Sequence, residues 1–344
     1  MSEKSVGVIG AGSFGTAIAN ILAERSDVML YARKPEVIEQ IKQTGKNKGY
    51  DMRPNVSLTN DLALLAKSCD IIFPIVPSSG FRSLMKALAP YLHPYHILIH
   101  GTKGLDLRIP EECPEDAPLN RDQVRTMSEV IKEETVVVRV GCLAGPNLAK
   151  ELSDQQPGAT VVASRFDEVI QEGQKLLRNE RFQVYGNPDL IGIELTGVLK
   201  NIIAIASGIL GGLGHGENAK GLLISRGMVE MIYLGRALGG NIQAFLGLAG
   251  VGDLVTTCNS TLSRNFTVGY RLAQGEKLTH IVETMEEVAE GINTVRIAKR
   301  FAERYQLRAL ITETLHKVLF EDLPANEAVD NLMRYPLTED IDFI

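Results

Sequence analysis

The stretch that decides the fold is "IGAGSFGTAIANILAERSDVMLYARKP", residues 9–35. It runs from the end of a short apolar strand, through a glycine-rich turn and a helical pattern, to a second apolar run at Val28–Tyr31. Gly10, Gly12 and Gly15 have G-x-G-x-x-G spacing. Such glycines allow a tight turn, close approach of a pyrophosphate and close helix–strand packing, and the helix N-terminus then attracts the phosphates. In this strand–turn–helix context the pattern predicts a dinucleotide site, with a ligand-free glycine turn as the less favoured alternative.

The residues after the second strand indicate which dinucleotide binds. An acidic side chain there accepts a hydrogen bond from the ribose 2′-hydroxyl of NAD, whereas an arginine pairs with the 2′-phosphate of NADP. This chain has Arg33 and Lys34, and no acidic residue before Glu36. We therefore expect NADP(H) to be preferred, with NAD(H) possible. The alternative is that this pair of cations is simply a solvated strand end.

Composition narrows the class of protein. The 344 residues suggest two domains, and a formal charge of −6 gives no general basic field for nucleic acid. The four cysteines show no metal-binding spacing, which predicts no metal site and reduced thiols in a cytoplasmic chain. Residues 1–5 form a short polar lead, so no signal peptide is expected. The most apolar region, Leu190–Gly214, carries Glu194, Lys200 and Asn201 and is expected to be a core helix, not a membrane span.

The first half of the chain alternates apolar β-branched runs with helical patterns, which predicts an α/β domain over residues 1–187 with a Rossmann-type parallel sheet. Pro74 cannot donate to a central ladder, so its strand should end early or bulge there. The acidic, proline-bearing stretch 108–122 is expected to be a mobile surface loop without a catalytic role. The predicted strands are Val6–Ile9, Val28–Tyr31, Ile71–Val76, Ile97–His100, Val136–Val140 and Thr160–Ala163.

From about Asn187 the strand-like runs disappear and patterns of helical period take over. They predict an all-helical C-terminal domain over residues 188–344, with the boundary near "YGNPDL", where Gly186 and Pro188 punctuate the chain. The predicted helices are 189–212, 217–238, 262–274, 277–289, 292–305, 312–320 and 324–334.

Lys200 lies in the apolar helical run "LTGVLKNIIAIASGILGG". A buried ammonium needs a partner or a ligand, so a functional lysine is favoured over one that reaches out to a domain edge. Asp253 and Thr257 are four apart and share a helix face if that segment is helical, although Asp253 as a helix cap is an equal alternative.

Two further places carry cations suited to a ligand. "Ser263-Arg264-Asn265" offers an arginine beside hydrogen-bonding side chains, which suits a phosphate or a carboxylate, although a surface ion pair is an equal alternative for Arg264. Lys103 follows a strand, at the sheet edge where open α/β sheets bind ligands. His215, in "GLGHGEN", is expected to be a loop residue and not a proton donor.

Several motifs, taken together, resemble the soluble NAD(P)-dependent glycerol-3-phosphate dehydrogenases. The resemblance runs in order from Val6 to about Leu332. Its motifs are "GAGSFGTA", "VPS" at 76–78, "TKGL" at 102–105, "GPNLAKEL" at 145–152, "YGNPDLIGIELTGVLKNIIAIASGI", "GENAKGLLISRGMVEM", "AGVGDLVTTC", "SRN" and "EGINT".

The resemblance implies reduction of dihydroxyacetone phosphate to sn-glycerol 3-phosphate for phospholipid synthesis, by an enzyme that is commonly a homodimer. It places Lys200 as proton donor and acceptor, with Lys103 stabilising the developing alkoxide and Asp253 beside them. The implied cofactor contacts are Gly10, Gly12, Ser13, Phe14, Gly15, Arg33, Lys34, Lys103, Ala149, Arg264, Val288 and Glu290. The implied substrate contacts are Lys103, Gly145, Asn147, Lys200, Asp253, Ser263, Arg264 and Asn265.

Two departures from the family pattern stand out. Asn147 occupies a position that is usually threonine, which puts one substrate hydrogen bond in question, and the 105–135 connection is longer than usual. Two rivals stay open. One is another Rossmann dehydrogenase with a helical second domain, acting on a β-hydroxyacid or a ketopantoate-like substrate. The other is a non-catalytic NADP(H) sensor.

Overall fold

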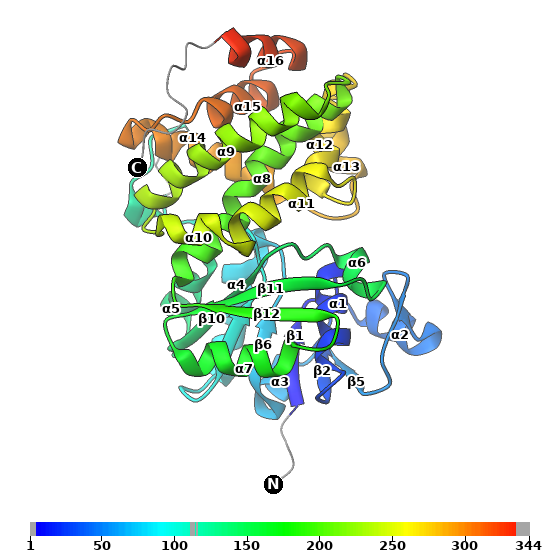
Figure 1. The fold of residues 1–344 in the computed structure, drawn as a ribbon. Coiled ribbons are helices and arrows are strands. Elements are labelled where there is room, and N and C mark those ends of the chain that lie inside the picture. The colour runs from blue at the N-terminus through cyan, green and yellow to red at the C-terminus, as the bar shows by residue number, and fades with distance from the viewer. Residues whose placement is uncertain (1–4, 111–113, 115, 335–344) are drawn as a thin grey trace. The chain divides into compact units, whose positions relative to one another are not determined.

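The computed structural model describes residues 5–110, 114 and 116–334. They fall into two compact units (Figure 1). The first runs to Asp106 and resumes from Arg125 to Glu194; the second takes Leu107–Val124 and the chain from Leu195 onward. Helix α8, Leu190–Gly212, contains the division between Glu194 and Leu195. The division therefore lies a few residues beyond the boundary at 187 and 188 that the sequence predicts.

The first unit contains an eight-stranded sheet in the order β12-β11-β10-β7-β6-β1-β2-β5. All neighbouring pairs are parallel except β10 with β11, so β11 and β12 run against the other six. The chain moves outward from β1 on one side and then returns to β6 on the other side of β1. The strands are β1 Ser5–Ile9, β2 Val28–Tyr31, β5 Val56–Thr59, β6 Cys69–Pro74, β7 Ile97–His100, β10 Arg139–Ala144, β11 Gly158–Ser164 and β12 Phe182–Asn187, with short strands β3 Lys46–Asn47, β4 Tyr50–Asp51, β8 Asp106–Leu107 and β9 Val124–Arg125.

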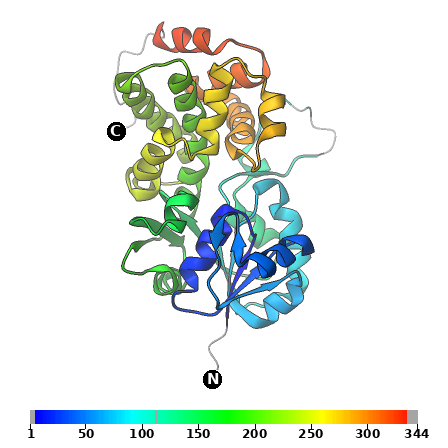
Figure 2. The same ribbon diagram turned by 90° about the vertical axis from the view of Figure 1, so that its right-hand side faces the viewer.

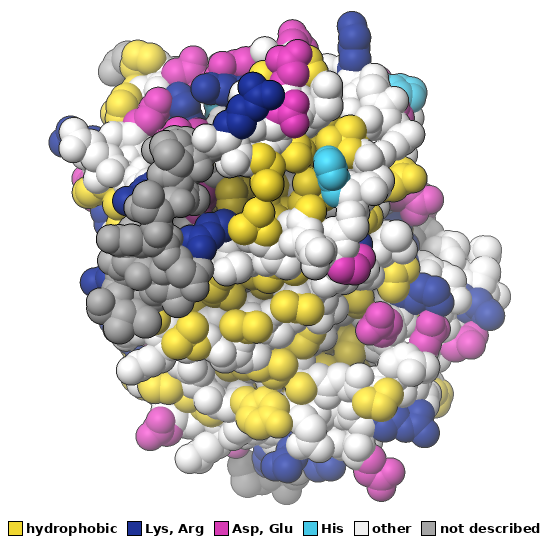
Figure 3. All heavy atoms as spheres, turned by 45° about the horizontal axis from the view of Figure 1, so that its top comes forward, with side chains coloured by type: hydrophobic (Ala, Val, Ile, Leu, Met, Phe, Trp, Pro, Cys, Tyr) yellow, Lys and Arg dark blue, Asp and Glu magenta, His cyan; other side chains and the backbone are white. Residues whose placement is uncertain are grey.

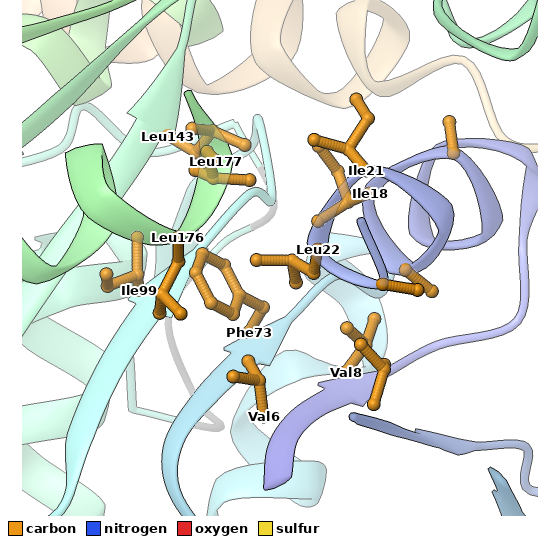
Figure 4. Close-up of a cluster of buried hydrophobic side chains, with 14 of the residues drawn as sticks. Val6, Val8, Ile18, Ile21, Leu22, Phe73, Ile99, Leu143, Leu176 and Leu177 are labelled. Atoms are coloured by element: carbon orange, nitrogen blue, oxygen red, sulfur yellow. The ribbon is translucent and has the colours of Figure 1, made fainter. Parts of the chain in front are cut away.

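Helices cover both faces of this sheet (Figures 1 and 2). One buried cluster packs α1 and α7 on the sheet, and Figure 4 shows Phe73 of β6 between Leu22 of α1 and Leu176 of α7. A second cluster packs α3, α4 and α5 on the other face. The apolar residues of each helix thus line up on one side, as an amphipathic helix requires. The helices are α1 Ser13–Leu22, α2 Pro35–Thr44, α3 Leu62–Ser68, α4 Ser78–Leu88, α5 Met127–Glu134, α6 Ala149–Ser153 and α7 Asp167–Leu177.

The α/β fold with a mainly parallel sheet is confirmed. Four of the predicted strands lie close to their predicted positions, namely β1, β2, β7 and β11. Strand β6 ends at Pro74, as the missing proline N–H requires. The run 136–140 was misplaced, because Val136 and Val138 are each 55% exposed and the strand is Arg139–Ala144. Strands β5 and β12 were not predicted; they pair at the two outer edges of the sheet, where short runs carry a weaker apolar pattern.

The second unit is helical in its described part, with α12 crossing beside α8 and α14. Its long helix α8 has the length and apolar composition of a membrane span, but 94% of its most apolar window is buried inside the structure, as in a core helix. Segment 242–259, left without a prediction apart from the shared face of Asp253 and Thr257, forms α10, a π-helical turn and α11. The helices are α8 Leu190–Gly212, α9 Glu217–Ala237, α10 Ile242–Leu246, α11 Asp253–Asn259, α12 Arg264–Ala273, α13 Leu278–Thr284, α14 Glu290–Tyr305, α15 Leu310–Phe320 and α16 Ala325–Arg334.

The stretch 108–122 differs from the loose surface loop expected for it. Leu119 is fully buried, and its N–H donates to the carbonyl of Arg300 at 3.2 Å. Arg300, 2% exposed, donates from Nε to the carbonyl of Ala117 at 2.7 Å. The described part of the stretch is therefore fixed to α14 of the helical unit; residues 111–113 and 115 lie outside the described residues.

Candidate active site

The glycine loop follows β1, at the point in the sheet where the strand order reverses between β1 and β6. Gly10 has φ +123°, and a Cβ built on it would lie 2.0 Å from the carbonyl oxygen of Ile75. A Cβ on Gly15 would lie 1.9 Å from the carbonyl oxygen of Gly10. Both positions therefore exclude any side chain: Gly10 permits the tight turn after β1, and Gly15 permits α1 to pack closely against it.

Helix α1 presents its first turn directly after this loop. Gly12 is its N-cap, no side chain caps it, and the first turn, which begins with Ser13 and Phe14, carries no acidic residue. An N-terminus of this kind suits the phosphates of a dinucleotide. The tight glycine turn and the uncapped start of α1 thus fit an NAD(P) cofactor.

Asn47 holds the glycine loop in place through its side chain, and the sequence did not predict this role. Its side chain is 2% exposed and donates from Nδ2 to the carbonyl of Ala11 at 3.0 Å and to Thr16 Oγ1 at 2.7 Å. Thr16 Oγ1 in turn donates to the carbonyl of Gly12 at 2.8 Å. No local pattern marks Asn47, because the contact joins residues 36 and 31 positions apart.

Arg33 and Lys34 lie just beyond the carboxyl end of β2 and are both exposed. Lys34 is the N-cap of α2, with Pro35 in the first turn. Adjacent β-strands β1 and β2 are parallel, so their carboxyl ends, and hence the glycine loop and Arg33, share one edge of the sheet. This is the edge at which open α/β sheets bind ligands.

Lys103 and Asn147 lie on the loops after β7 and β10, two neighbouring parallel strands. Lys103 donates from Nζ to the carbonyl of Gly145 at 3.2 Å, so two predicted substrate residues are brought together. Asn147 donates from Nδ2 to Thr160 Oγ1 at 2.8 Å, while its Oδ1 is buried without a hydrogen-bond partner. A buried acceptor in this state costs free energy unless a ligand or water donates to it. Nearby, Ala149 begins the short helix α6.

A buried polar pair supports the loop that carries Lys103. His100, the last residue of β7, lies with its Nε2 3.2 Å from Glu194 Oε1 and 3.0 Å from Ser128 Oγ. Although burial opposes ionisation of Glu194, the nearby His100 and the bond from the Ser128 N–H lower the pKa of this carboxyl below its usual range. No local sequence pattern predicts this pair, because its members are distant in the chain.

In the helical unit, Lys200 of α8 is held by two residues of α11. Its Nζ donates to Asp253 Oδ1 in a short contact and to Thr257 Oγ1 at 2.6 Å. All three are almost completely buried, at 4%, 1% and 4% exposure respectively. The Thr257 hydroxyl donates to the carbonyl of Asp253 at 2.6 Å, so it can only accept from Lys200. Both contacts are acceptors, which suits the ammonium form of the lysine.

Lys200, which the sequence predicts to need a partner or a ligand, thus has Asp253 as its partner, and segment 253–259 is helical. Thr257, whose shared face with Asp253 the sequence revealed, joins the cluster as a third member. Burial raises the pKa of the adjacent Cys258 to about 12, which keeps its thiol protonated. Cys69, Cys142 and Cys258 are buried thiols that form no disulfide, and Cys113 lies outside the described residues. No group of candidate metal ligands occurs among the residues that the structure describes.

The first turn of α12 carries the other predicted substrate residues. Ser263 is its N-cap and accepts from the N–H of Phe266 at 3.3 Å. Asn265 Oδ1 accepts from the N–H of Gly291 at 2.9 Å, and a Cβ on Gly291 would lie 2.8 Å from the carbonyl oxygen of Asn201. Because Asn201 adjoins Lys200, this packing holds Asn265 in the same region of the unit.

Arg264 differs from its buried neighbours Ser263 and Asn265 in being exposed. Its side chain is 47% exposed, donates to the carbonyl of Val288 at 3.0 Å and lies 3.3 Å from Glu287. Val288 is 51% exposed, and Glu290 begins α14 shortly after it. Arg264, Val288 and the start of α14 therefore form one accessible edge of the helical unit. A ligand anion there would compete with Glu287 for the guanidinium.

Comparison with known proteins agrees with this chemistry. The family model for the NAD-dependent glycerol-3-phosphate dehydrogenase N-terminus matches residues 5–170, and that for the C-terminus matches residues 189–330. The chain is 42% identical to the glycerol-3-phosphate dehydrogenase [NAD(P)+] of Geobacter sulfurreducens over 97% of both chains. It is 39% identical to the protein of that name from Ectopseudomonas mendocina, over 99% of this chain and 97% of the other.

Solved structures give the same result. The crystal structure of glycerol-3-phosphate dehydrogenase from Coxiella burnetii superposes with a TM-score of 0.87 at 31% identity, covering 96% of this chain and 99% of that one. A ketopantoate reductase from Ralstonia eutropha, at 14% identity, covers 96% of this chain and all of its own with a TM-score of 0.59. The likeness to the ketopantoate reductase shows a shared fold and nothing about activity.

Proposed function

The chain belongs to the NAD-dependent glycerol-3-phosphate dehydrogenase family, and we propose that its buried Lys200 carries the proton in that family's reaction. The protein is an oxidoreductase that uses NAD(P)(H) to interconvert dihydroxyacetone phosphate and sn-glycerol 3-phosphate, the backbone of glycerophospholipids. The observation that carries the assignment to Lys200 is its burial against Asp253 and Thr257.

The reduction needs a hydride at the ketone carbon and a proton at the ketone oxygen. Bound NAD(P)H would supply the hydride, and the glycine loop with the N-terminus of α1 is proposed to hold its pyrophosphate. Lys200 donates its Nζ proton to the oxygen as negative charge develops there. Asp253 and Thr257 fix the ammonium in position and stabilise its charge, so little reorganisation is needed during the step.

Substrate recognition is proposed to rest on a few polar groups. By its place in "TKGL", Lys103 is assigned to electrostatic stabilisation of the substrate oxygen. Arg264 and Asn265, by their place in "SRN", are assigned to the substrate phosphate, and the exposure of Arg264 agrees with a ligand-gripping guanidinium. Asn147 offers an unpartnered buried acceptor, Oδ1, to a donor such as the substrate hydroxyl. The remaining predicted residues, Gly145 and Ser263, shape the backbone at these positions.

We also propose a preference for NADPH over NADH. The support is the pair Arg33 and Lys34, exposed at the end of β2 with no acidic residue before Glu36. A guanidinium can grip the 2′-phosphate with paired hydrogen bonds, and Lys34 adds a weaker point charge. We also propose a homodimer, as the family resemblance implies, and sedimentation velocity measures its mass directly. A cytoplasmic location is proposed because the cysteines form no disulfide among the described residues.

The function is tested by following NADPH oxidation with dihydroxyacetone phosphate, 2-ketopantoate and a panel of β-keto acids. The account predicts that kcat/KM is highest for dihydroxyacetone phosphate. Ketopantoate as the best substrate would favour a different dehydrogenase on the same fold. Tight NADPH binding without any turnover would favour a sensor.

A further inference from the structure

A carboxylate lies beside the arginine that is proposed to bind the substrate phosphate. Nη1 of Arg264 is 3.3 Å from Oε2 of Glu287. The Arg264 side chain is 47% exposed and the Glu287 side chain 24% exposed, so the pair is open to solvent on one side. Glu287 belongs to the loop 285–289 between α13 and α14, whereas the first turn of α12 carries no acidic residue of its own. A different element of the helical unit therefore brings the carboxylate to Arg264.

The backbone holds Arg264 in place independently of this carboxylate. Nη1 also donates to the carbonyl of Val288 at 3.0 Å. The next residue, Ala289, is buried, which anchors this part of the loop. An exposed ion pair such as that of Arg264 with Glu287 contributes little to stability. Removal of the Glu287 carboxylate should thus leave the guanidinium where it is, so orienting Arg264 is not the main effect of the pair.

The main effect of Glu287 is electrostatic. A phosphate bound to the guanidinium of Arg264 would lie about 5 Å from the Glu287 carboxylate if both anions stayed on it. Two unit charges at about that distance repel strongly enough in water to weaken binding by about fourfold, and by more beside a half-buried surface. If Glu287 leaves instead, the phosphate has to replace the ion pair. Either way, Glu287 opposes the binding of an anion to Arg264.

This edge of the helical unit is separate from its apolar cavity. Figure 3 shows a hollow with a hydrophobic floor, and helices α8, α9, α15 and α16 line the cavity there. Its lining includes none of Arg264, Glu287 and Val288. A change at Glu287 should therefore act on Arg264 and not on that cavity.

We propose that Glu287 is a specificity-determining residue that competes with the substrate phosphate for Arg264. It pairs with the guanidinium in the ligand-free protein and makes phosphate esters bind more loosely than Arg264 alone would allow. The phosphate is remote from the reacting carbonyl, so the effect falls on binding and not on the rate of the chemical step. This inference rests on the proposed assignment of Arg264 to the substrate phosphate.

Titration of the full-length protein with inorganic phosphate, followed by phosphorus NMR, tests the proposal without turnover. Glu287→Gln removes the charge with little change of shape and should lower the Kd for inorganic phosphate by about three- to tenfold. It should lower KM for dihydroxyacetone phosphate by a similar factor and leave KM for unphosphorylated dihydroxyacetone unchanged. The single-turnover rate of NADPH oxidation should stay at the wild-type value. Loss of a merely structural contact would not tighten the binding of one ketone alone.

Glu286→Gln is the matched control, because Glu286 is exposed and the variant makes the same change of net charge one residue away. It should change the Kd for inorganic phosphate by about twofold at most, since solvent and salt screen an exposed charge. Glu287→Ala should give the same gain in affinity as Glu287→Gln, and if one of the two fails to fold, the other decides. Adding Arg264→Leu to Glu287→Gln should abolish the gain.

Unchanged or weaker phosphate binding in Glu287→Gln would overturn the inference, because Glu287 would then be inert or would orient Arg264. Arg264→Leu separates this failure from a failure of the proposed function. If Arg264→Leu weakens the phosphorylated ketone selectively while Glu287→Gln tightens nothing, only the inference about Glu287 is wrong. If Arg264→Leu affects both ketones equally, the assignment of Arg264 is wrong and the inference falls with it.

Discussion

Breaking the buried pair between Lys200 and Asp253 separates the structural role of the cluster from its catalytic role. In Lys200→Met the Asp253 carboxylate, 1% exposed, loses the ammonium that donates to it, while the Thr257 hydroxyl stays 3.2 Å from its Oδ1. Removing one partner of a buried ion pair costs about 3–5 kcal/mol, because the other charge stays buried without compensation. Replacing both partners, as in Lys200→Met with Asp253→Leu, is expected to recover most of that loss.

The assay is urea unfolding of wild type, both single variants and the double variant, which gives the coupling energy of the pair. Lys220→Met is the control, because Lys220 pairs with Glu217 at 2.9 Å on the surface and its loss should cost only about 0–1 kcal/mol. The double variant should be folded, bind NADPH and have almost no turnover. If Lys200→Met lowers the unfolding free energy no more than Lys220→Met does, Lys200 and Asp253 are not a charged pair.

Three further predictions concern the cofactor, the substrate and pH. Arg33→Asp should weaken NADPH binding by at least about 1.5–3 kcal/mol and NADH binding much less, so the cofactor preference can invert. An unchanged ratio of the two Kd values would show that Arg33 is only a solvated strand end. Arg264→Leu should raise KM for dihydroxyacetone phosphate by about 10- to 100-fold and leave unphosphorylated dihydroxyacetone nearly unaffected, whereas an equal loss for both ketones would exclude a phosphate contact. Burial raises the pKa of Glu230 from 4.5 to about 7, so its contribution to stability is greatest at low pH and is lost as pH rises through about 7. Between about pH 5 and about pH 8 the wild type should therefore lose about 2.5 kcal/mol of unfolding free energy relative to Glu230→Gln, and parallel pH profiles of the two proteins would contradict this.

Sequence patterns predict the parts of this molecule that are local. The glycine loop could be interpreted because the three glycines, the strand before them and the helix after them are contiguous, and the structure gives steric reasons for Gly10 and Gly15. Lys200 could be singled out because an ammonium in an apolar helix needs a partner. Asp253 and Thr257 could be placed on one face because they are four residues apart.

The parts that escaped prediction depend on distant contacts. Asn47 supports the glycine loop from a short hairpin, and Glu194 meets His100 across 94 positions of the chain, so neither has a neighbouring pattern to mark it. Likewise, Leu119 looks like part of a surface loop by composition, and its burial depends on α14. The antiparallel β11 could not be distinguished from a parallel strand by its apolar run, because direction is set by the connection before it.

The central claim, that Lys200 gives the proton to the substrate, is tested most directly by the single-turnover rate of NADPH oxidation in Lys200→Met saturated with NADPH and dihydroxyacetone phosphate. The account predicts a rate about 10²–10⁴ times below that of the wild type, with the Kd for NADPH nearly unchanged. A single-turnover rate within about tenfold of the wild type would contradict it.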